Sequence, residues 1–421
     1  MKNERLMSID ALRGFDMFFI MGGAALITAL AHWHPCGFTE TLAEQMDYVG
    51  WDGLRHYDTI FPLFLFIAGI SFPFSMQIML FAALAQWFPC GFTETLAEQM
   101  EHVEWDGLRH HDTIFPLFLF IAGISFPFSL QKQIEKGKSM TSIYLKILRR
   151  GLMLVLLGMI YGGLLKFEFE TQRIPSVLGR IGLAWMFAAF IFTATGKKLW
   201  PKVAVVPIIL IAYWLVSAFV HAPGVDPSID PLTREGNIAC YIDRTLLGAH
   251  CYKADYDPEG LFSTIPAICT AMLGMLTGLF VQRSKPSSKT ALTLFAAGIV
   301  FAILGAAWNI VYPINKALWS SSFVLAVAGY SLVMFALFYY IIEVLGWRWW
   351  TLFFTVIGMN SITIYLGQRF INFSYTADKL FGGLVKLMPE DSQEFFTKAA
   401  YIAVCWLFLY FLYRKKVFLK V

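Results

Sequence analysis

Ten apolar stretches recur along the chain, and they constrain its fold more than any other feature of the sequence. The run from 113 to 130 holds 18 residues without a charge, about the length that one helical crossing of a bilayer needs. Only 15% of the 421 residues are charged and 57% are hydrophobic, whereas an ordinary soluble domain has about 25% charged residues. We therefore predict an all-α membrane protein, a bundle of about ten to eleven transmembrane helices. The apolar stretches are 14–31, 113–130, 151–166, 176–194, 203–220, 263–282, 290–308, 319–345, 352–370 and 398–413.

Lysine and arginine gather in alternate connections between these stretches, which predicts how the protein lies in the membrane. The basic connections are 2–13, 132–150, 197–202, 283–289 and 414–420. By the positive-inside rule both termini are cytoplasmic, and the acidic loop 221–262 and the segment 371–397 lie outside. The net charge of +4 is small and spread over several loops, so we read it as orientation and not as a nucleic-acid footprint. Asp10, Arg13 and Asp16 interrupt the N-terminal apolar run, so we expect a retained first span and not a cleaved signal peptide.

The chain contains a tandem repeat. Residues 33–75 and 87–129 align at an offset of 54 with five differences in 43 positions. One difference puts Tyr48 in the first copy where the second copy has His102. We interpret 33–86 as a recent duplication, or an assembly fault, inserted into a single domain that spans 1–421. The alternative is an internal repeat of the transporter kind, which predicts two diverged halves of several helices.

The insertion also has to keep the membrane orientation. An odd number of added crossings would put the basic connection 132–150 outside. We therefore expect the first copy to form a re-entrant or distorted hairpin, broken near Pro73. Its second apolar piece spans only about 20 Å as a helix, against a core of roughly 30 Å.

A polar, histidine-rich segment ends abruptly at the apolar run that starts at residue 113. It contains His102, the Trp105-Asp106-Gly107 turn and a His111-Asp112 pair. An imidazole with a pKa near 6.5 can accept a proton from an attacking amine or hydroxyl, or carry an acyl group. A carboxylate such as Asp112 could hold its tautomer. A single loop histidine is more often solvated than catalytic, but His102, His110 and His111 beside two acids favour an active site.

Further charged and polar residues fall at membrane depth. Asp10 and Arg13 can pair on one helix face, as a functional group or as an interface anchor. Arg180 needs a buried acceptor, for which a substrate carboxylate, a phosphate and Asp112 all qualify. The connection with Asn315 and Lys316 either anchors an aromatic belt or lines a cavity.

Two more groups have simple structural explanations. Small residues at 358–361, around Asn360, suit helix packing, and turn chemistry explains Asp257-Pro258-Glu259-Gly260. Cys240 and Cys251 share the outer loop and could pair in an oxidising compartment. The Cys and His spacing matches no metal site, so we expect no metal.

Taken together, these residues resemble one known family, the heparan-alpha-glucosaminide N-acetyltransferases and their bacterial relatives, a branch of the transmembrane acyltransferases. Order and rough spacing agree over about residues 5–370. The matching motifs are Asp10-x-x-Arg13-Gly14, His102-x-x-Trp105-x-Gly107, Asp112-x-x-Phe115-Pro116, Arg173-Ile174-Pro175-x-Val177-Leu178-x-Arg180, Tyr241-Ile242-Asp243-Arg244, Asp257-Pro258-Glu259-Gly260, Pro313-Ile314-Asn315-Lys316 and Gly358-Met359-Asn360-Ser361.

The resemblance implies an enzyme that takes acetyl-CoA from the cytoplasm and acetylates an amino sugar on the other side of the membrane. The catalytic histidine would be His102, and family members look dimeric, so a homodimer is implied. Three departures matter, and the first is that the lumenal N-terminal domain of the mammalian branch is absent, so heparan itself need not be the acceptor. The first copy has Tyr48 at the histidine position, and Tyr365-Leu366-Gly367 is followed by Gln368 where the mammalian branch has a second histidine. The short N-terminus suggests a bacterial inner membrane.

These implications assign roles to the residues above. His102 is the expected base or acetyl carrier, and Asp112 orients it. The expected acceptor contacts are Trp105, Arg180, Asn315, Lys316 and Asn360. The expected acetyl-CoA contacts are Asp10, Arg13, Arg149 and Arg150, helped by Lys146 through charge-assisted hydrogen bonds to phosphate. The alternatives are O-acetylation of an envelope polysaccharide or lipid-linked sugar, a secondary transporter that uses Asp10, Asp16 and Arg180, and an inactive scaffold.

Overall fold

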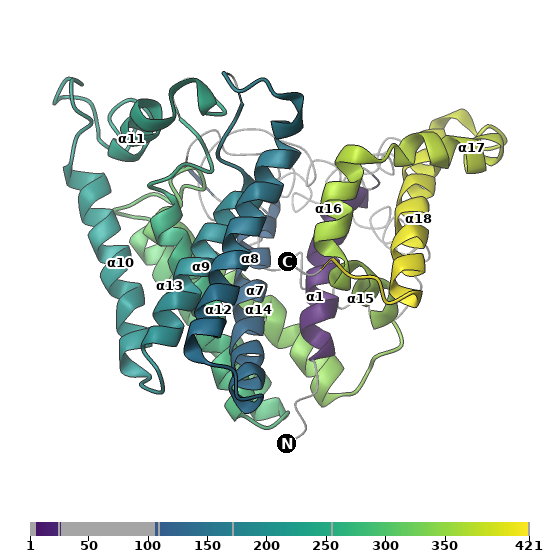
Figure 1. Ribbon diagram of the computed structural model, residues 1–421, viewed down its shortest axis with the longest axis horizontal. Helices are drawn as coiled ribbons and strands as arrows, with labels where there is room; N and C mark the ends of the chain where they lie inside the picture. The colour runs from purple at the N-terminus through teal and green to yellow at the C-terminus, as the bar shows by residue number, and fades with distance from the viewer. Residues whose placement is uncertain are drawn as a thin grey trace, which may run out of the picture.

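The structure is a computed structural model that describes residues 6–23, 26, 106–107, 110–170, 172–253 and 256–419 (Figure 1). Within these ranges the chain is helical and contains no strand, apart from one isolated bridge between His221 and Asn237. This confirms the all-α prediction for the described part. The duplicated insertion 33–86 and the hairpin expected near Pro73 lie outside the described residues.

The helices form two groups, which Figure 1 shows side by side. The larger group contains α7 (His110–Glu135), α8 (Met140–Tyr161), α9 (Val177–Ala194), α10 (Trp200–Phe219), α12 (Thr264–Arg283), α13 (Ser288–Trp308) and α14 (Ser321–Tyr339). The smaller group contains α1 (Met7–Phe18), α15 (Thr351–Met359), α16 (Ser361–Phe370), α17 (Phe373–Val385) and α18 (Gln393–Arg414). The connection between α10 and α12 contains α11 (Ile238–Leu247). Short 3-10 turns lie at Leu164–Lys166, Gly248–His250 and Glu390–Ser392, and π-helical turns at Phe19–Gly23 and Tyr340–Val344.

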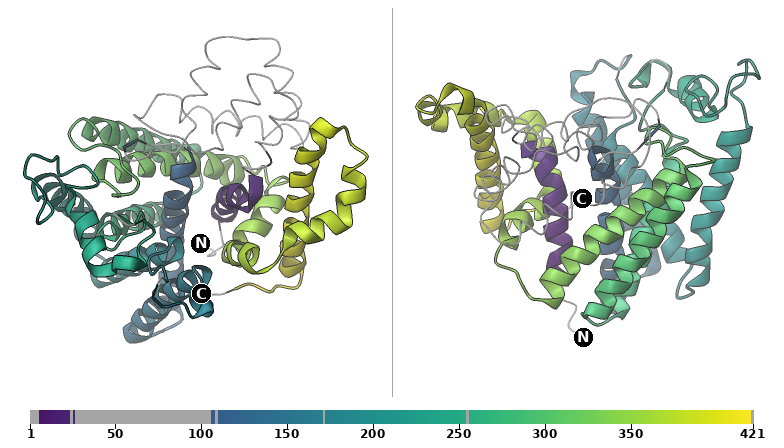
Figure 2. Two further views of the ribbon diagram at one scale, coloured as in Figure 1. Left: turned by 90° about the horizontal axis from the view of Figure 1, so that it is seen from above. Right: turned by 180° about the vertical axis from the view of Figure 1, so that it is seen from behind.

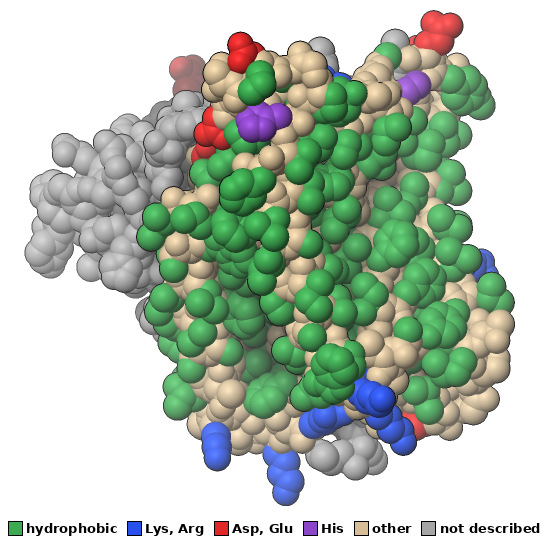
Figure 3. Space-filling model, turned by 90° about the vertical axis from the view of Figure 1, so that its left-hand side faces the viewer, with side chains coloured by type: hydrophobic (Ala, Val, Ile, Leu, Met, Phe, Trp, Pro, Cys, Tyr) green, Lys and Arg blue, Asp and Glu red, His purple; other side chains and the backbone are tan. Residues whose placement is uncertain are grey.

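Within the described residues, seven helices are long and apolar enough to cross a membrane: Asp112–Glu135, Val177–Ala194, Trp200–Phe219, Thr264–Arg283, Ser288–Trp308, Ser321–Val344 and Phe396–Arg414. Of these, the span Ser321–Val344, which contains α14, is 89% buried, whereas α10 and α13 are each only 28% buried. Figure 3 shows such an apolar face, with acidic side chains at its upper end and basic ones at its lower end. An exposed apolar belt of this kind marks an integral membrane protein. The orientation of the termini and the count of ten to eleven crossings stay predictions.

Helix α1 joins the two groups. Its residues Ile9, Ala11 and Leu12 belong to the larger hydrophobic core, and Met17 and Phe18 belong to a second core with α15, α16 and α18. Seen from above, α1 lies between the larger group and the smaller one (Figure 2). Any polar residue on α1 therefore faces protein on several sides.

Glycines let two helix pairs approach closely. A Cβ at Gly274 of α12 would lie 2.1 Å from the carbonyl oxygen of Phe120 on α7. A Cβ at Gly358 of α15 would lie 2.1 Å from the carbonyl oxygen of Asp10, and one at Gly14 of α1 would lie 1.7 Å from that of Phe354. Packing by small residues, which the sequence predicted around Asn360, thus holds for Gly358.

Three predicted boundaries were wrong. The basic segment 132–150 is not one long connection, because α8 already begins at Met140, where the Ser139 hydroxyl caps it by accepting from the N–H of Ser142 at 3.3 Å. Helix α1 begins at Met7, ahead of the apolar run at 14–31. The predicted span 352–370 is two helices, because the backbone at Asn360 (φ −121°, ψ 25°) leaves helical geometry between α15 and α16.

Candidate active site

The first turn of α7 is tied to the connection between α13 and α14. The Lys316 ammonium donates to Asp112 Oδ1 at 2.9 Å. The Asp112 side chain is 3% exposed and that of Lys316 is 27% exposed. A carboxylate in the first turn of a helix is favoured by the helix dipole. Asp112 is therefore a buried acid with a cation partner, a pairing that the sequence analysis did not predict.

Asn315 links the connection between α13 and α14 to the chain that precedes α7. Its Nδ2 donates to Asp106 Oδ1 at 3.1 Å, and its Oδ1 accepts from the N–H of Leu318 at 2.8 Å. The N–H of Gly107 also donates to the carbonyl of Ile314. Both polar atoms of the Asn315 side chain thus have protein partners. The connection 314–316 binds the chain at 106–107 and again at Asp112.

The predicted catalytic histidine lies in the segment just before these ties. His102 and Trp105 are outside the described residues, and so are the side chains of His110 and His111. The described part therefore brings together Asp112, Asn315 and Lys316 from the predicted set. The hydrogen bond from Asn315 to Asp106 holds the chain four residues after His102.

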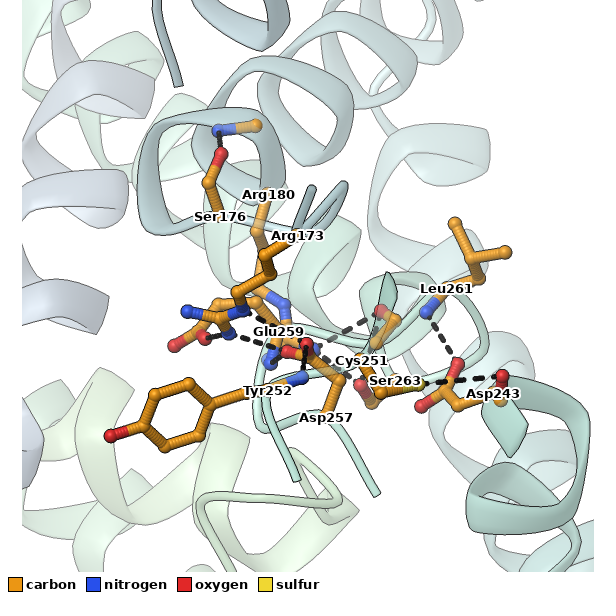
Figure 4. Close-up of polar contacts among 12 residues, drawn as sticks. Arg173, Ser176, Arg180, Asp243, Cys251, Tyr252, Asp257, Glu259, Leu261 and Ser263 are labelled. Carbon is orange, nitrogen blue, oxygen red and sulfur yellow. Dashed lines mark hydrogen bonds and ion pairs between the residues drawn. The ribbon is translucent and has the colours of Figure 1, made fainter. Parts of the chain in front are cut away.

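A second polar cluster lies beside the start of α9 (Figure 4). Arg173 donates from Nε and Nη2 to the two carboxylate oxygens of Asp257 at 3.0 and 2.6 Å, and Nη2 also donates to Glu259. Asp257 accepts from the N–H groups of Tyr252 at 2.7 Å and Glu259 at 2.9 Å. Turn chemistry alone, the interpretation given to 257–260, was therefore incomplete. The arginine partner came from a distant motif and could not be read from local spacing.

Arg180 finds its acceptors in this cluster. It is 2% exposed, and its Nη2 donates to the Gly260 carbonyl at 3.2 Å and to the Ser263 hydroxyl. Its guanidinium lies 5.0 Å from the centre of the Trp319 ring, a cation–π distance. Of the three acceptors that the sequence left open, Asp112 is not used. Nε and Nη1 of Arg180 have no hydrogen-bond partner among the described residues.

Charge and burial shift two pKa values in this cluster. Burial lowers the pKa of Arg173, but its hydrogen bonds and the charges of Asp257 and Glu259 outweigh burial and raise that pKa above its usual value. Burial raises the pKa of Asp243 to about 6, although the N–H of Leu261 donates to Oδ1 at 2.9 Å. Cys240 and Cys251 do not form a disulfide with each other. The described residues contain no group of His, Cys, Asp and Glu that could hold a metal ion.

A third cluster lies deeper in the bundle, around the middle of α7. Arg13 Nη2 donates to Ser125 Oγ at 3.1 Å, and Nη1 lies 3.5 Å from both Asp10 Oδ1 and the Gly358 carbonyl. Ser125 lies about 20 Å along α7 from Asp112, at about 1.5 Å per residue. Arg13, with Asp10 as its ion-pair partner, thus contacts α7 well inside the helix, and not at its first turn.

Two of the predicted acetyl-CoA contacts, Arg149 and Arg150, lie on different faces of α8. The Arg150 guanidinium lies 4.3 Å from the Trp185 ring centre, and Trp185 packs against Phe126, the neighbour of Ser125. Arg150 is half-buried and close enough to Arg13 for their positive charges to act on each other. Arg149 is exposed, as expected for a neighbour about 100° around the helix. The structure therefore joins Asp10, Arg13 and Arg150, and leaves Arg149 apart.

Two more polar residues lie just beyond Arg13. Asp16 and Asn360 are each 2% exposed. Asp16 Oδ2 and both amide atoms of Asn360 have no hydrogen-bond partner in the part of the chain that the structure describes. Such buried, unpaired polar atoms are uncommon in proteins. The sequence analysis assigned Asn360 to the acceptor, whereas in the structure it lies two residues after Gly358, whose carbonyl is 3.5 Å from Arg13 Nη1.

The fold and its charged interior define a polytopic membrane protein with polar sites at two depths. No family model matches the chain. The chain is 29% identical over 376 residues to the heparan-alpha-glucosaminide N-acetyltransferase of Mus musculus and 28% identical over 376 residues to that of Homo sapiens. Each match covers 76% of this chain and 56% of the relative's length. The chain is thus a relative of these acetyltransferases, which confirms the resemblance seen in its motifs.

Proposed function

We propose that the protein is a membrane acetyltransferase that moves an acetyl group from cytoplasmic acetyl-CoA to an amino sugar on the other side of the membrane. The observation that carries the proposal is the similarity to the two curated acetyltransferases over 376 residues. The two buried polar sites along α7 support it. They could serve a donor that enters from one side and an acceptor that enters from the other.

The cluster of Asp10, Arg13 and Arg150, here called the inner site, suits the phosphate groups of acetyl-CoA. Arg13 and Arg150 bring two guanidinium groups to one place, and Asp10 is the acid paired with Arg13. Ionisable groups at membrane depth are costly and usually functional. Guanidinium groups bind phosphate through bidentate, charge-assisted hydrogen bonds. We assign Asp10, Arg13 and Arg150 to this end, and Arg149 to the entrance.

The cluster of Asp112, Asn315 and Lys316, here called the outer site, suits the acetyl transfer. The acceptor amine attacks the carbonyl carbon of the thioester, the carbon–sulfur bond breaks, and CoA leaves as a thiol after it takes a proton. His102 accepts the proton that the amine loses, with Asp112 to orient it and Lys316 to hold Asp112. Trp105 contacts the amino sugar, whereas Arg180 and Asn315 hold the neighbouring connections in place.

Transfer across a membrane tests the proposal directly. Purified protein in sealed vesicles receives labelled acetyl-CoA on one side and glucosamine on the other. Labelled N-acetylglucosamine on the acceptor side supports the proposal. Labelling of sugars that carry only hydroxyl groups would instead identify an O-acetyltransferase, and glucosamine uptake without acetyl-CoA would identify a transporter.

Two finer points stay predictions. The homodimer that the resemblance implies has no support from the described part of the chain, and neither has the bacterial inner membrane. Cross-linking in native membranes tests the first, and fractionation of a producing cell tests the second.

A further inference from the structure

The break between α15 and α16 puts an unused amide side chain inside the protein. Asn360 ends α15 and begins α16, the position where an asparagine usually caps the new helix. Its side chain makes no such hydrogen bond, and neither Oδ1 nor Nδ2 has another partner among the described residues. Burial of an amide without partners costs a few kcal/mol, so a ligand or water that satisfies it is expected.

Asp16 lies at the same height in the bundle. Helices α1 and α15 run in the same direction, because Thr351 contacts Met7 at their starts and Gly358 packs on the backbone of Asp10 and Gly14 further along. Asp16 and Asn360 each follow two residues after those contacts. They come from helices that pack together, and both are 2% exposed with unpaired polar atoms.

We propose that Asn360 and Asp16 bind the amide-bearing pantetheine arm of the acyl donor, and not the sugar. This inference rests on the proposed function and assigns a ligand to a part of its site. An amide ligand offers one N–H donor and one carbonyl acceptor. The Asn360 side chain offers the complementary acceptor and donor, and Asp16 Oδ2 accepts a second N–H.

The depth of the pair fits this part of the donor. Arg13, which binds the Gly358 carbonyl and Ser125, lies one helical turn before Asp16 on α1. Asp112 lies about 20 Å nearer the start of α7 than Ser125 does. If guanidinium groups hold the phosphates and the thioester reacts near Asp112, the intervening arm passes Asn360 and Asp16. Its two amides can then bond to the unpaired polar atoms of Asn360 and Asp16.

The test separates the arm from the nucleotide. Asn360→Leu keeps the branched shape and the number of side-chain heavy atoms and removes the polar atoms, and it breaks no described hydrogen bond of the side chain. Binding to purified full-length protein is measured for CoA and for its nucleotide half alone, adenosine 3′,5′-bisphosphate. We expect CoA to bind N360L about tenfold more weakly, as for the loss of one or two buried hydrogen bonds. The nucleotide half should bind N360L and wild type equally.

Thr193→Val is the matched control. Thr193 of α9 is also buried with an unpaired hydroxyl, but it belongs to the other helix group. T193V should bind CoA like wild type, and both variants should keep or raise the melting temperature. If N360L does not accumulate, Asn360→Asp serves in the same test, because it keeps the acceptor oxygen and replaces the amide donor with a second acceptor.

Each result has one meaning. Unchanged CoA affinity in N360L, or an equal loss of CoA and nucleotide binding, overturns the role of Asn360 while the acetyltransferase proposal stands. Wild-type protein that binds neither CoA nor the nucleotide overturns the proposed function, and this inference with it. Selective loss of CoA binding supports both.

Discussion

Lys316 and Asp112 form an ion pair 2.9 Å long that joins the connection after α13 to the first turn of α7. The carboxylate is almost fully buried, and its cation is partly exposed. The pair therefore positions the acid that follows the predicted catalytic histidine, and its removal should affect both stability and reaction.

Lys316→Met should lower the melting temperature and the rate of acetyl transfer. It removes the ammonium donor of Asp112, and the loss of a hydrogen bond between charged groups costs on the order of 1.5–3 kcal/mol. Lys316→Arg should recover much of both. Lys289→Met, at an exposed position, is the control and should change neither. Melting curves in detergent and initial rates measure the effect, and K316M with wild-type values for both would contradict it.

His102→Ala should abolish acetyl transfer and leave the amount of folded protein unchanged. The reason is chemical, because the proton of the attacking amine loses its base. Tyr48→Ala is the matched control, since Tyr48 holds the equivalent position in the first copy of the repeat. Turnover by H102A close to that of Y48A would remove His102 from the mechanism.

Asp257→Asn should loosen the connection between α10 and α12. It weakens a bidentate, charge-assisted contact with Arg173, and such contacts are about twice as strong as neutral ones. We expect a loss on the order of 1–3 kcal/mol and faster amide exchange at Tyr252 and Glu259, whose N–H groups bind Asp257. Glu235→Gln, an exposed carboxylate of the same loop, should leave exchange unaltered. Equal exchange in D257N and wild type would speak against the role.

Asp243 should make stability depend on pH. Its pKa is raised from its ordinary value of 3.8 to about 6, so the folded protein binds this proton more tightly than the unfolded chain. The charged form therefore destabilises the fold above about pH 6, and that penalty fades as the pH falls towards 4. Asp243→Asn should melt higher than wild type at pH 7.5, with a difference that shrinks by pH 4. A difference that is constant over this range would disprove the shift.

Gly358→Ala should separate α1 from α15. The added Cβ would lie 2.1 Å from the Asp10 carbonyl oxygen, a backbone atom that cannot move alone. Overpacking of this kind costs about 1–3 kcal/mol or more, so the melting temperature should fall. Gly383→Ala on α17, where a Cβ meets nothing within 4 Å, should be neutral or stabilising. Similar melting points for both variants would show that the helix pair adapts.

Much of this architecture was predictable because lipid imposes long apolar segments. Each apolar stretch predicted here contains helix in the described part of the chain. The break at Asn360 was not predictable, because no proline or run of polar residues marks it. The pairing of Arg173 with Asp257 and of Lys316 with Asp112 was also missed, since residues 84 and 204 positions apart meet only through tertiary packing.

The connection 314–316 has one more consequence. It holds Gly107 through Ile314 and Asp112 through Lys316, so the five-residue step between these points has a fixed length. Residues gained or lost inside that step would turn Asp112 away from its cation, whereas length added upstream of Asp106 leaves the register of α7 untouched. The 54-residue duplication lies entirely upstream of Asp106, where added length does not change the register of α7.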